Sequence, residues 1–406
     1  MFLVKACGLI VEYNPLHNGH LYHIKEARNI SQAECMIAVM SGSFLQRGEP
    51  AIIDKYHRTK TALASGVDIV LELPYPYAVQ SSKLFAKGSV HTLNEIGVSN
   101  ICFGSEQGTI DHFINSYHMY QKHIKTYEQE LKHYLARGYS FPQASKHAYE
   151  KIGLTEGHVD LSQPNNILGF SYVQTILDDQ LSIKPLTIKR TKSQYHDQTI
   201  DGSIASATSI RKQLMSQQQI TTATARSMPS QTIDKLNKYK KLSSVWHHWQ
   251  LYFPYLHYRV MTMSSEELSL IHGIEEGLEN RIKRTALEAT SFKHWMELVK
   301  TKRYTWTRLQ RTFVHILTNT TKEQINFINN IPSVPYIRLL GLTKVGQAYL
   351  RHVKKHVDVP LFSELGRYDH LCLELEERAS DAYYSVLPPV NKIQFRRQEL
   401  QPPIFA

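Results

Sequence analysis

The sequence predicts an α/β fold, with a Rossmann-like parallel sheet in the first half of the chain followed by a mainly helical region. Over the first half of the 406 residues, short apolar runs alternate with helical patterns, and strands joined by helices form right-handed βαβ units. Beyond about residue 225 the strand pattern fades and longer helical patterns dominate. We therefore expect a sheet-containing domain over residues 1–225, a helical region over 226–385 and a tail over 386–406.

The expected strands are short apolar runs bounded by turn residues, over residues 7–11, 35–40, 67–73, 98–103 and 183–189. The expected helices have helical spacing of apolar residues or end at a glycine, and they cover residues 21–28, 54–65, 80–96, 111–152 and 161–179, with another beginning near Thr208. Ligands of parallel sheets bind at the carboxyl ends of the strands. The loops that follow these runs are therefore the expected ligand-binding loops.

Composition limits the class of protein. With 42% hydrophobic and 20% charged residues the chain is typical of a globular protein. No apolar run approaches the roughly 18–20 residues of a membrane span, and the N-terminus lacks a signal-peptide layout, so we expect a cytoplasmic protein without a membrane partner. The cysteines lie far apart without metal-ligand spacing, which predicts reduced core thiols and no metal site; they are Cys7, Cys35, Cys102 and Cys372. No pattern in the sequence fixes an oligomeric state.

The net charge of +11 favours a polyanionic partner. The helical region contains a basic stretch, residues 281–311, with Trp295, Tyr304 and Trp306 interleaved. Lys and Arg bind RNA phosphates and aromatic side chains stack on unpaired bases, so this stretch predicts RNA binding. The alternative is a solvated helix face whose aromatic residues belong to the core. The predicted RNA contacts are Arg281, Lys283, Arg284, Lys302, Arg303, Arg308 and Arg311.

The turn after the first expected strand is the most informative segment. His17, Gly19 and His20 lie at an expected helix N-terminus, where imidazole donors and backbone N–H groups together favour anions such as the phosphates of ATP. Gly19 would let the chain approach a nucleotide closely. The pattern matches the His-x-Gly-His motif of the HIGH nucleotidyltransferase superfamily, in which the histidines stabilise charge on the transferring phosphoryl group. The alternative is a histidine-rich turn without a ligand.

Two further segments are candidates for the same site. Residues 206–211, Ser-Ala-Thr-Ser-Ile-Arg, resemble the Ser-Ser-Thr-x-Ile-Arg motif of small nucleotidyltransferases, which predicts that Ser209 and Arg211 hold phosphates; the alternative is an ordinary helix cap. Arg47 follows the second expected strand. It could orient a carboxylic acid substrate, a phosphate or a nucleotide base, or it could form a surface ion pair. Secondary candidates at the next helix start are Asp54, Lys55 and Arg58.

Longer stretches carry a more specific resemblance, over residues 8–21, 41–50, 103–106, 162–169, 188–190, 273–281 and 302–305. Together they resemble the bacterial tRNA(Met) cytidine acetate ligase family over nearly the whole chain. The resemblance implies a two-step reaction. ATP and acetate would give acetyl-adenylate and pyrophosphate, and the exocyclic amine of the wobble cytidine of elongator tRNA(Met) would then attack the acetyl carbon to form N4-acetylcytidine.

The resemblance also implies which residues contact ATP. By matching motif these are Cys7, Gly8, Leu9, Ile10, Val11, Glu12, Tyr13, Asn14, Pro15, Leu16, His17, Asn18, Gly19, His20, Gly104, Asn165 and Arg190, to which the second motif adds Ser209 and Arg211. The expected catalytic residues are His17, His20 and Arg47. Mg²⁺ is expected to accompany ATP.

The implied chemistry is consistent in itself. A free carboxylate is a poor acyl donor because its leaving group would be oxide, so an adenylate must form first, and a weakly nucleophilic base amine must then be positioned against it. No residue pattern decides between acetate, formate and propionate. One rival hypothesis is a small-metabolite adenylyltransferase, which leaves the basic half unexplained. Another is a non-catalytic RNA-binding protein, against which the intact His17, Gly19 and His20 argue.

Overall fold

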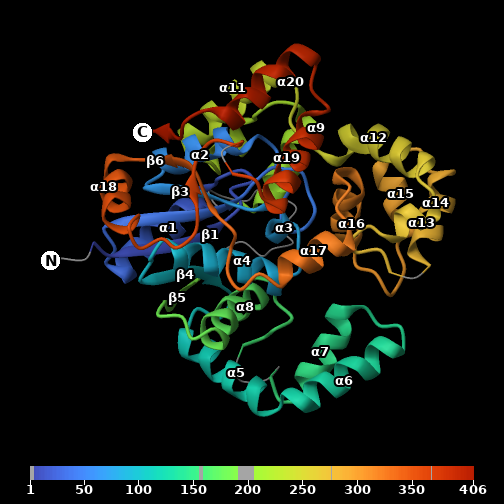
Figure 1. The fold of residues 1–406 in the computed structure, drawn as a ribbon, viewed down its shortest axis with the longest axis horizontal. Helices are drawn as coiled ribbons and strands as arrows, with labels where there is room; N and C mark the ends of the chain where they lie inside the picture. Colours follow the sequence, from blue (N-terminus) through green and yellow to red (C-terminus); the bar gives the residue numbers. More distant parts are fainter. Residues whose placement is uncertain (1–3, 155–158, 191–204, 276, 367) are drawn as a thin grey trace.

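The computed structural model describes residues 4–154, 159–190, 205–275, 277–366 and 368–406, arranged around a central β-sheet (Figure 1). The strand order is β5-β4-β1-β2-β3-β6-β7, and β8 also pairs with β6. Strands β1 to β5 are mutually parallel, which confirms the predicted α/β fold with a parallel sheet. The bounds are Ala6–Val11 (β1), Cys35–Ser41 (β2), Ile69–Leu73 (β3), Asn100–Ser105 (β4), Lys184–Lys189 (β5), Ile337–Leu342 (β6), Leu361–Phe362 (β7) and Ile404–Phe405 (β8).

Side chains that alternate along the strands divide the core into two parts, one on each face of the sheet. In β2, Ile37 belongs to the core that includes Phe85, whereas Met36 belongs to the core that includes Ile24. All residues of β2 are buried, because helices cover both faces. Burial on both faces explains why the strands of this sheet read as continuous apolar runs in the sequence.

The path of the chain through the sheet determines where a ligand can bind. Strands β1, β2 and β3 follow one another in one direction, and the chain then returns to β4 on the other side of β1. The strand order therefore reverses between β1 and β4, which is where open α/β sheets bind ligands. The helices of this half are α1 (Asn18–Ser31), α2 (Lys55–Ala64), α3 (Tyr75–Ala78), α4 (Ser82–Glu95), α5 (Ile110–Lys122), α6 (Ile124–Ala136), α7 (Phe141–Lys151), α8 (Pro164–Asp178), α9 (Ala207–Gln217) and α10 (Thr222–Arg226).

The second half is mainly helical, as expected, and α12 to α16 lie together beside the sheet (Figure 1). Its helices are α11 (Ser230–Ser243), α12 (Trp249–Thr262), α13 (Ser265–Ser269), α14 (Leu278–Ala286), α15 (Phe292–Val299), α16 (Trp306–Thr318), α17 (Lys322–Asn329), α18 (Lys344–Val353), α19 (Leu371–Tyr384) and α20 (Pro389–Arg396), followed by the 3-10 helix η1 (Arg397–Leu400). None of the helices in the described ranges has the length and apolar character needed to cross a membrane.

The second half also returns to the sheet, which differs from the expected division into separate segments. Strand β6 pairs antiparallel with β3, so residues 1–225 and 226–385 share one sheet. The strand was missed because Arg338 interrupts its apolar run. Residues 386–406 are not a loose tail either, because Glu399 is fully buried and β8 pairs with β6.

A buried ionic network joins these distant segments. Its cations are Lys55 of α2 and Arg338 of β6, and its carboxylates are Glu72 of β3, Glu376 of α19 and Glu399 of η1, with side chains at most 1% exposed. Lys55 Nζ lies 2.6 Å from Glu72 Oε1 and 3.0 Å from Glu399 Oε2. Arg338 bridges the same two carboxylates at 2.6 and 2.8 Å. The network therefore connects both ends of the chain to the centre of the sheet.

The charges of this network balance if one carboxyl is protonated. Burial, together with the neighbouring Glu72 carboxylate, raises the pKa of Glu376 to about 8. Burial alone would also raise the pKa of Glu399, but the charges of Lys55 and Arg338 outweigh it and lower that pKa to about 2. At neutral pH we therefore expect Glu376 to be neutral and Glu399 to be ionised beside the two cations.

Replacing Lys55 by Met should strongly destabilise the fold, because two buried carboxylates would then share one cation. We expect a loss of about 3–5 kcal/mol in the free energy of unfolding, measured by urea denaturation. The control is Lys293→Met, since Lys293 is an 82% exposed partner of Glu297 on α15. An unfolding midpoint for Lys55→Met equal to that of the control would contradict a role for the network in stability.

Candidate functional site

A cleft with a volume of about 260 Å³ lies at the carboxyl ends of β1, β4 and β5, where the strand order reverses. Its walls come from the turn after β1, the loop after β2 and the starts of α8 and α9. Most of the predicted site residues line it, although they are far apart in the sequence. They are Ile10, Val11, Glu12, Tyr13, Asn14, His17, Gly19, His20, Arg47, Gly104, Asn165, Arg190 and Arg211.

The remaining predicted nucleotide contacts lie outside this lining. They are Cys7, Gly8, Leu9, Pro15, Leu16, Asn18 and Ser209. Cys7 and Leu9 are buried in the sheet, and Asn18 donates its side-chain N–H to the carbonyl of Arg226. Ser209 donates its hydroxyl to the carbonyl of Ser206 at 2.8 Å, within the helix cap that was the alternative interpretation. Ser206, Ala207 and Thr208 line the cleft in its place.

His17 and His20 are held in one tautomer by the start of α1. His17 Nδ1 accepts a hydrogen bond from the backbone N–H of Gly19 at 3.0 Å, and His20 Nδ1 accepts from the N–H of His17 at 3.3 Å. Their rings stack with centroids 3.8 Å apart. Because Nδ1 is the acceptor in both rings, a neutral imidazole must carry its proton on Nε2. Each histidine therefore keeps an Nε2–H donor for a ligand.

Both histidines are neutral at physiological pH. Burial, followed by the charges of Arg190 and Arg211, lowers the pKa of His17 to about 3. Burial and the neighbouring His17 hold the pKa of His20 well below its usual range. A neutral pair with fixed N–H donors can stabilise a negative charge that develops on a phosphoryl oxygen by hydrogen bonding, without transferring a proton.

The turn between β1 and α1 is fixed by contacts from other elements. Tyr13 has a φ of 47°, and the Asn14–Pro15 peptide bond is cis. Asn14 Oδ1 accepts a hydrogen bond from the N–H of Ile52 at 2.7 Å, and the Asn14 carbonyl accepts one from Arg211 Nη1 at 2.9 Å. The second motif is thus joined directly to the first, which favours its functional interpretation over an isolated helix cap.

The secondary candidates at the start of α2 contact the backbone and the buried core next to the cleft. Arg58 donates to the carbonyls of Glu12 at 2.7 Å and Ser41 at 2.9 Å. Asp54 caps α2 by accepting from the N–H of His57, and Lys55 belongs to the buried network. These side chains lie outside the cleft lining, so their positions indicate a structural role.

Sequence reasoning missed Glu106, a residue that orients a predicted ATP contact. Glu106 Oε1 accepts a hydrogen bond from Asn165 Nδ2 at 2.6 Å, and Glu106 Oε2 accepts from the N–H of Asn166 at 2.8 Å. The carboxylate thus sits at the N-terminus of α8 and fixes the Asn165 amide. Its place directly after the strand β4 was the available signal. Other cleft residues that were not predicted include Tyr22, His23, Gln46 and Lys189.

The acidic side chains of the cleft are already engaged within the protein. Glu49 Oε2 lies 2.6 Å from Arg211 Nη2, and Glu12 Oε1 accepts from the N–H of Gln46 at 2.8 Å. Within the described ranges, no group of three His, Cys, Asp or Glu side chains is arranged to hold a metal ion. Glu12 and Glu49 provide oxygen donors of the kind that Mg²⁺ takes when nucleotide phosphates and water supply its other ligands.

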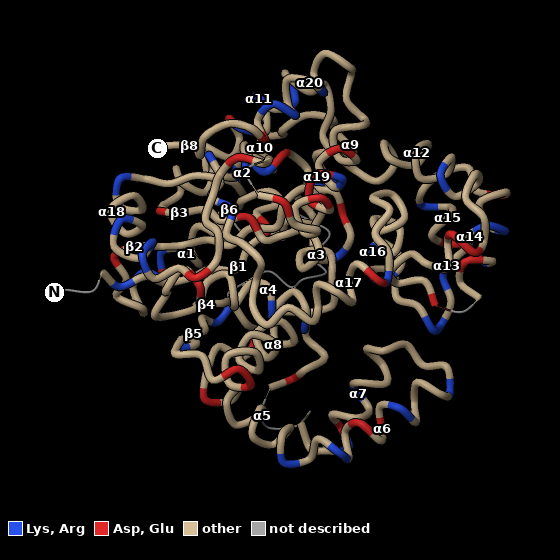
Figure 2. Tube along the Cα trace, viewed as in Figure 1, with Lys and Arg blue, Asp and Glu red and all other residues tan. Residues whose placement is uncertain are grey.

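The predicted RNA contacts fall into two groups. Arg284, Lys302 and Arg303 are exposed, and Figure 2 shows blue Lys and Arg segments along α14 and α15. The other four interact with the protein itself: Arg281 and Lys283 donate to backbone carbonyls, Arg308 pairs with Glu275, and Arg311 donates to the carbonyl of Gln46. Of the interleaved aromatic residues, Trp295 and Tyr304 are buried and Trp306 is 37% exposed.

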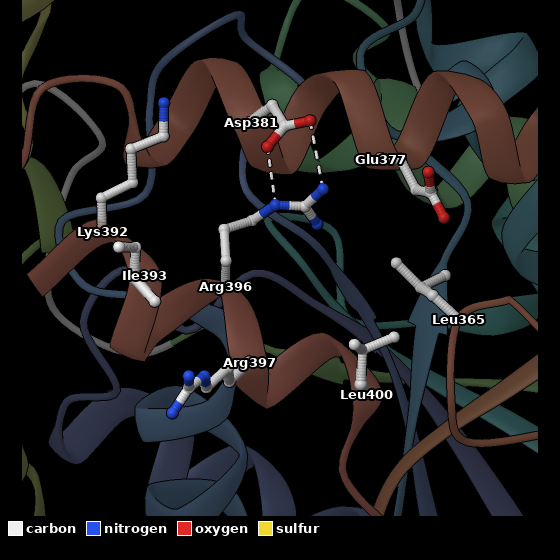
Figure 3. A pocket seen from close by; sticks show the side chains of 8 residues that line it. All are labelled: Leu365, Glu377, Asp381, Lys392, Ile393, Arg396, Arg397 and Leu400. Atoms are coloured by element: carbon white, nitrogen blue, oxygen red, sulfur yellow. Dashed lines mark hydrogen bonds and ion pairs between the residues drawn. The ribbon is translucent and has the colours of Figure 1, made fainter. Parts of the chain in front are cut away.

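A second cavity, of about 400 Å³, lies between α19 and α20 and contains none of the predicted site residues (Figure 3). Its lining residues are Leu365, Glu377, Asp381, Lys392, Ile393, Arg396, Arg397 and Leu400. Arg396 Nε lies 2.6 Å from Asp381 Oδ1, so the charge of this arginine is already balanced. The cleft at the ends of β1, β4 and β5 therefore remains the candidate functional site.

A doubly wound sheet with a His-x-Gly-His turn after its first strand is the arrangement of HIGH-type nucleotidyltransferases. The family model of the HIGH nucleotidyl transferases matches residues 4–399. The tRNA(Met) cytidine acetate ligase of Oceanobacillus iheyensis is 53% identical over 99% of this chain and 100% of its own length. That of Bacillus subtilis is 46% identical over 98% and 96%. This chain therefore belongs to the bacterial tRNA(Met) cytidine acetate ligase family.

Solved structures agree over the whole fold. The apo structure of Thermotoga maritima TmcAL matches with a TM-score of 0.91 and 33% identity, covering 99% of both chains. The structure of the same protein bound with alpha-thio ATP matches with a TM-score of 0.89 and 31% identity, again over 99% of both chains. The likeness includes the sheet and the helices on either side of it.

His17 should not titrate in the physiological range, because burial keeps its pKa near 3 in the folded protein. Long-range nitrogen–proton NMR of the free protein should show an Nε2–H tautomer for this ring that is unchanged between about pH 5.5 and pH 8. The His17→Asn variant assigns the signal, and a histidine-containing peptide serves as a titrating control. A midpoint between pH 6 and 7, roughly that of a free imidazole, would refute the neutral pair.

Proposed function

We propose that this protein activates acetate with ATP as acetyl-adenylate and transfers the acetyl group to the wobble cytidine of elongator tRNA(Met), giving N4-acetylcytidine. The main observation is the cleft itself, which gathers the predicted ATP contacts of β1, β4, β5, α8 and α9 at the place where such sheets bind ligands. The names of the relatives support the acceptor and the acid. Both the ATP and the tRNA would be met in the cytoplasm.

ATP would bind with its phosphates at the N-terminus of α1. His17 and His20 line the cleft at this helix start and are neutral hydrogen-bond donors, and Arg190 and Arg211 line the same cleft with positive charge. Gly104 lets the Arg190 side chain lie close to the end of β4, because a Cβ there would lie only 3.3 Å from Arg190 Cγ. Asn165, oriented by Glu106, can hydrogen-bond the nucleotide.

The first step transfers the adenylyl group to acetate. An acetate oxygen attacks the α-phosphorus of ATP, the bond from that phosphorus to the bridging oxygen breaks, and pyrophosphate leaves. Negative charge grows on the phosphoryl oxygens, where His17 and His20 can stabilise it. Mg²⁺ bound to the phosphates would neutralise part of this charge. Carboxylate oxygens are usual ligands of Mg²⁺, and Glu12 and Glu49 line the cleft.

The second step transfers the acetyl group to RNA. The exocyclic amine of cytidine attacks the acetyl carbon, AMP leaves, and the amine loses a proton after the attack. Because the amine is a weak nucleophile, positioning contributes most to this step. The loop that carries Arg47 lines the cleft, and helix α16 contacts the same loop at Gly48, so an RNA bound at the helical region would lie close to this loop.

The test is an assay of the purified protein with ATP, radiolabelled acetate and tRNA, followed by digestion and separation of the nucleosides. We expect labelled acetylcytidine that requires ATP. His20→Ala should lower the rate by about 100-fold or more, because it removes a donor to the transition state. His20→Gln, which keeps an N–H donor, should retain more activity, and the exposed His352 on α18 provides the control His352→Ala.

The partial reactions separate the possible failures. Pyrophosphate release that depends on acetate, without labelled RNA, would preserve the adenylation step and reject the acceptor. The absence of both acetate-dependent pyrophosphate release and labelled RNA would favour the alternative, a small-metabolite adenylyltransferase whose own substrate is missing from the assay. Equal rates for His20→Ala and His352→Ala would reject the role given to His20.

A further inference from the structure

Arg311 of α16 has no acidic partner among the residues that the structure describes. In the described part of the chain it makes a single hydrogen bond, from Nη1 to the carbonyl of Gln46 at 3.4 Å, and no ion pair. This distance is long for a hydrogen bond of an arginine, which has five N–H donors. Arg311 is partly buried. A guanidinium that is partly removed from water normally has a carboxylate partner, because burying an unpaired charge is costly.

The neighbours of Arg311 add positive rather than negative charge. Burial and the charges of Arg308 and Arg47 lower the pKa of Arg311 to about 10. Burial, with the charges of Arg311 and Arg308, likewise lowers the pKa of His272 to about 4. Glu275 is 61% exposed and pairs with Arg308. The position therefore has the character of an anion-binding site.

The position lies between the nucleotide cleft and the helical region. Arg308 and Arg311 are three residues apart on α16 and so lie on the same side of that helix. Gly48 has a φ of +74°, and a Cβ at that position would overlap the backbone of Arg311. Arg47 and Gln46, next to Gly48, line the nucleotide cleft. The loop of Gln46, Arg47 and Gly48 would therefore separate an anion bound by Arg311 from the nucleotide cleft.

We propose that Arg311, together with Arg308 and Arg47, binds the backbone phosphate next to the acceptor nucleotide of the RNA substrate. This inference rests on the proposed function, because it requires an RNA substrate. Arginine binds phosphate oxygens with paired N–H donors, which also fixes their orientation. Enzymes that modify a base must turn it out of its stack, and a phosphate clamp outside the cleft holds the backbone while the base enters.

A structural role and a binding role for Arg311 predict opposite effects on stability. Replacing a buried arginine that supports the fold lowers the melting temperature. Replacing one whose charge is unneutralised in the free protein leaves the melting temperature unchanged or raises it, because the cost of burying the charge disappears. The stability of Arg311→Gln therefore distinguishes the two roles independently of activity.

The test compares the wild type, Arg311→Gln and the control Arg351→Gln, which removes an exposed arginine from α18. The probe is a labelled anticodon stem-loop of elongator tRNA(Met), titrated at several salt concentrations. We expect Arg311→Gln to raise the Kd about tenfold and to reduce the slope of log K against log salt by about 1, without lowering the melting temperature. Arg351→Gln should leave all three quantities as in the wild type.

The other outcomes reject the proposal in distinct ways. An unchanged Kd, or a KM for ATP that rises while the Kd for RNA stays constant, would overturn it; the second result would assign the site to a nucleotide phosphate. If Arg311→Gln melts at a lower temperature, Arg311→Lys decides, since it keeps the charge and loses the paired donors: a Kd equal to that of the wild type overturns the clamp. A wild type that fails to bind the stem-loop would instead reject the proposed function.

Discussion

The buried contact of Lys55 and Arg338 with the carboxyl groups of Glu72, Glu376 and Glu399 is the constraint on which the arrangement of the whole chain depends. Each ion costs several kcal/mol when it leaves water, and this cost is offset only when its partners are in place. The partners come from α2, β3, β6, α19 and η1, so neither half of the chain can complete the network alone. The network thereby couples folding of the C-terminal segments to the sheet that forms the nucleotide cleft.

The same network positions the loop between β2 and α2. Gly42, at the start of this loop, leaves no space for a side chain, since a Cβ would lie 2.6 Å from Glu72 Oε1 and 3.0 Å from Glu376 Oε1. Further along, the N–H of Gln46 donates to Glu12 in the cleft, and Trp249 of α12 donates to the carbonyl of Gly48 at 2.8 Å. One loop therefore contacts the ionic core, the nucleotide cleft and the helical region.

Local patterns account for what the sequence alone could predict. The strands β1 to β5 are apolar runs because both faces of the sheet are covered, and the His-x-Gly-His turn lies within four residues at one helix start. Long-range pairing accounts for what was missed. The strand of Arg338 was missed because its ion-pair partner Glu72 is 266 positions away in the sequence. Lys55 was a secondary site candidate because its buried carboxylate partners could not be located from the sequence. The basic residues near Arg311 in the sequence predicted it as an RNA contact. Its contact with the loop of Gln46 and Arg47 depends on how α16 packs and could not be predicted.

The two proposed binding places use positive charge in different ways. In the nucleotide cleft, burial keeps His17 and His20 neutral, so they can act on a ligand only as oriented hydrogen-bond donors. The charge of Arg211 is partly balanced by Glu49. At α16, Arg308 pairs with Glu275, whereas Arg311 has no acidic partner among the described residues, which favours a ligand that carries its own negative charge. A site with fixed neutral donors suits a charge that develops during reaction, whereas an unneutralised cation suits a charge that is present throughout. The division between adenylate chemistry and RNA positioning therefore follows from which charges the protein itself balances.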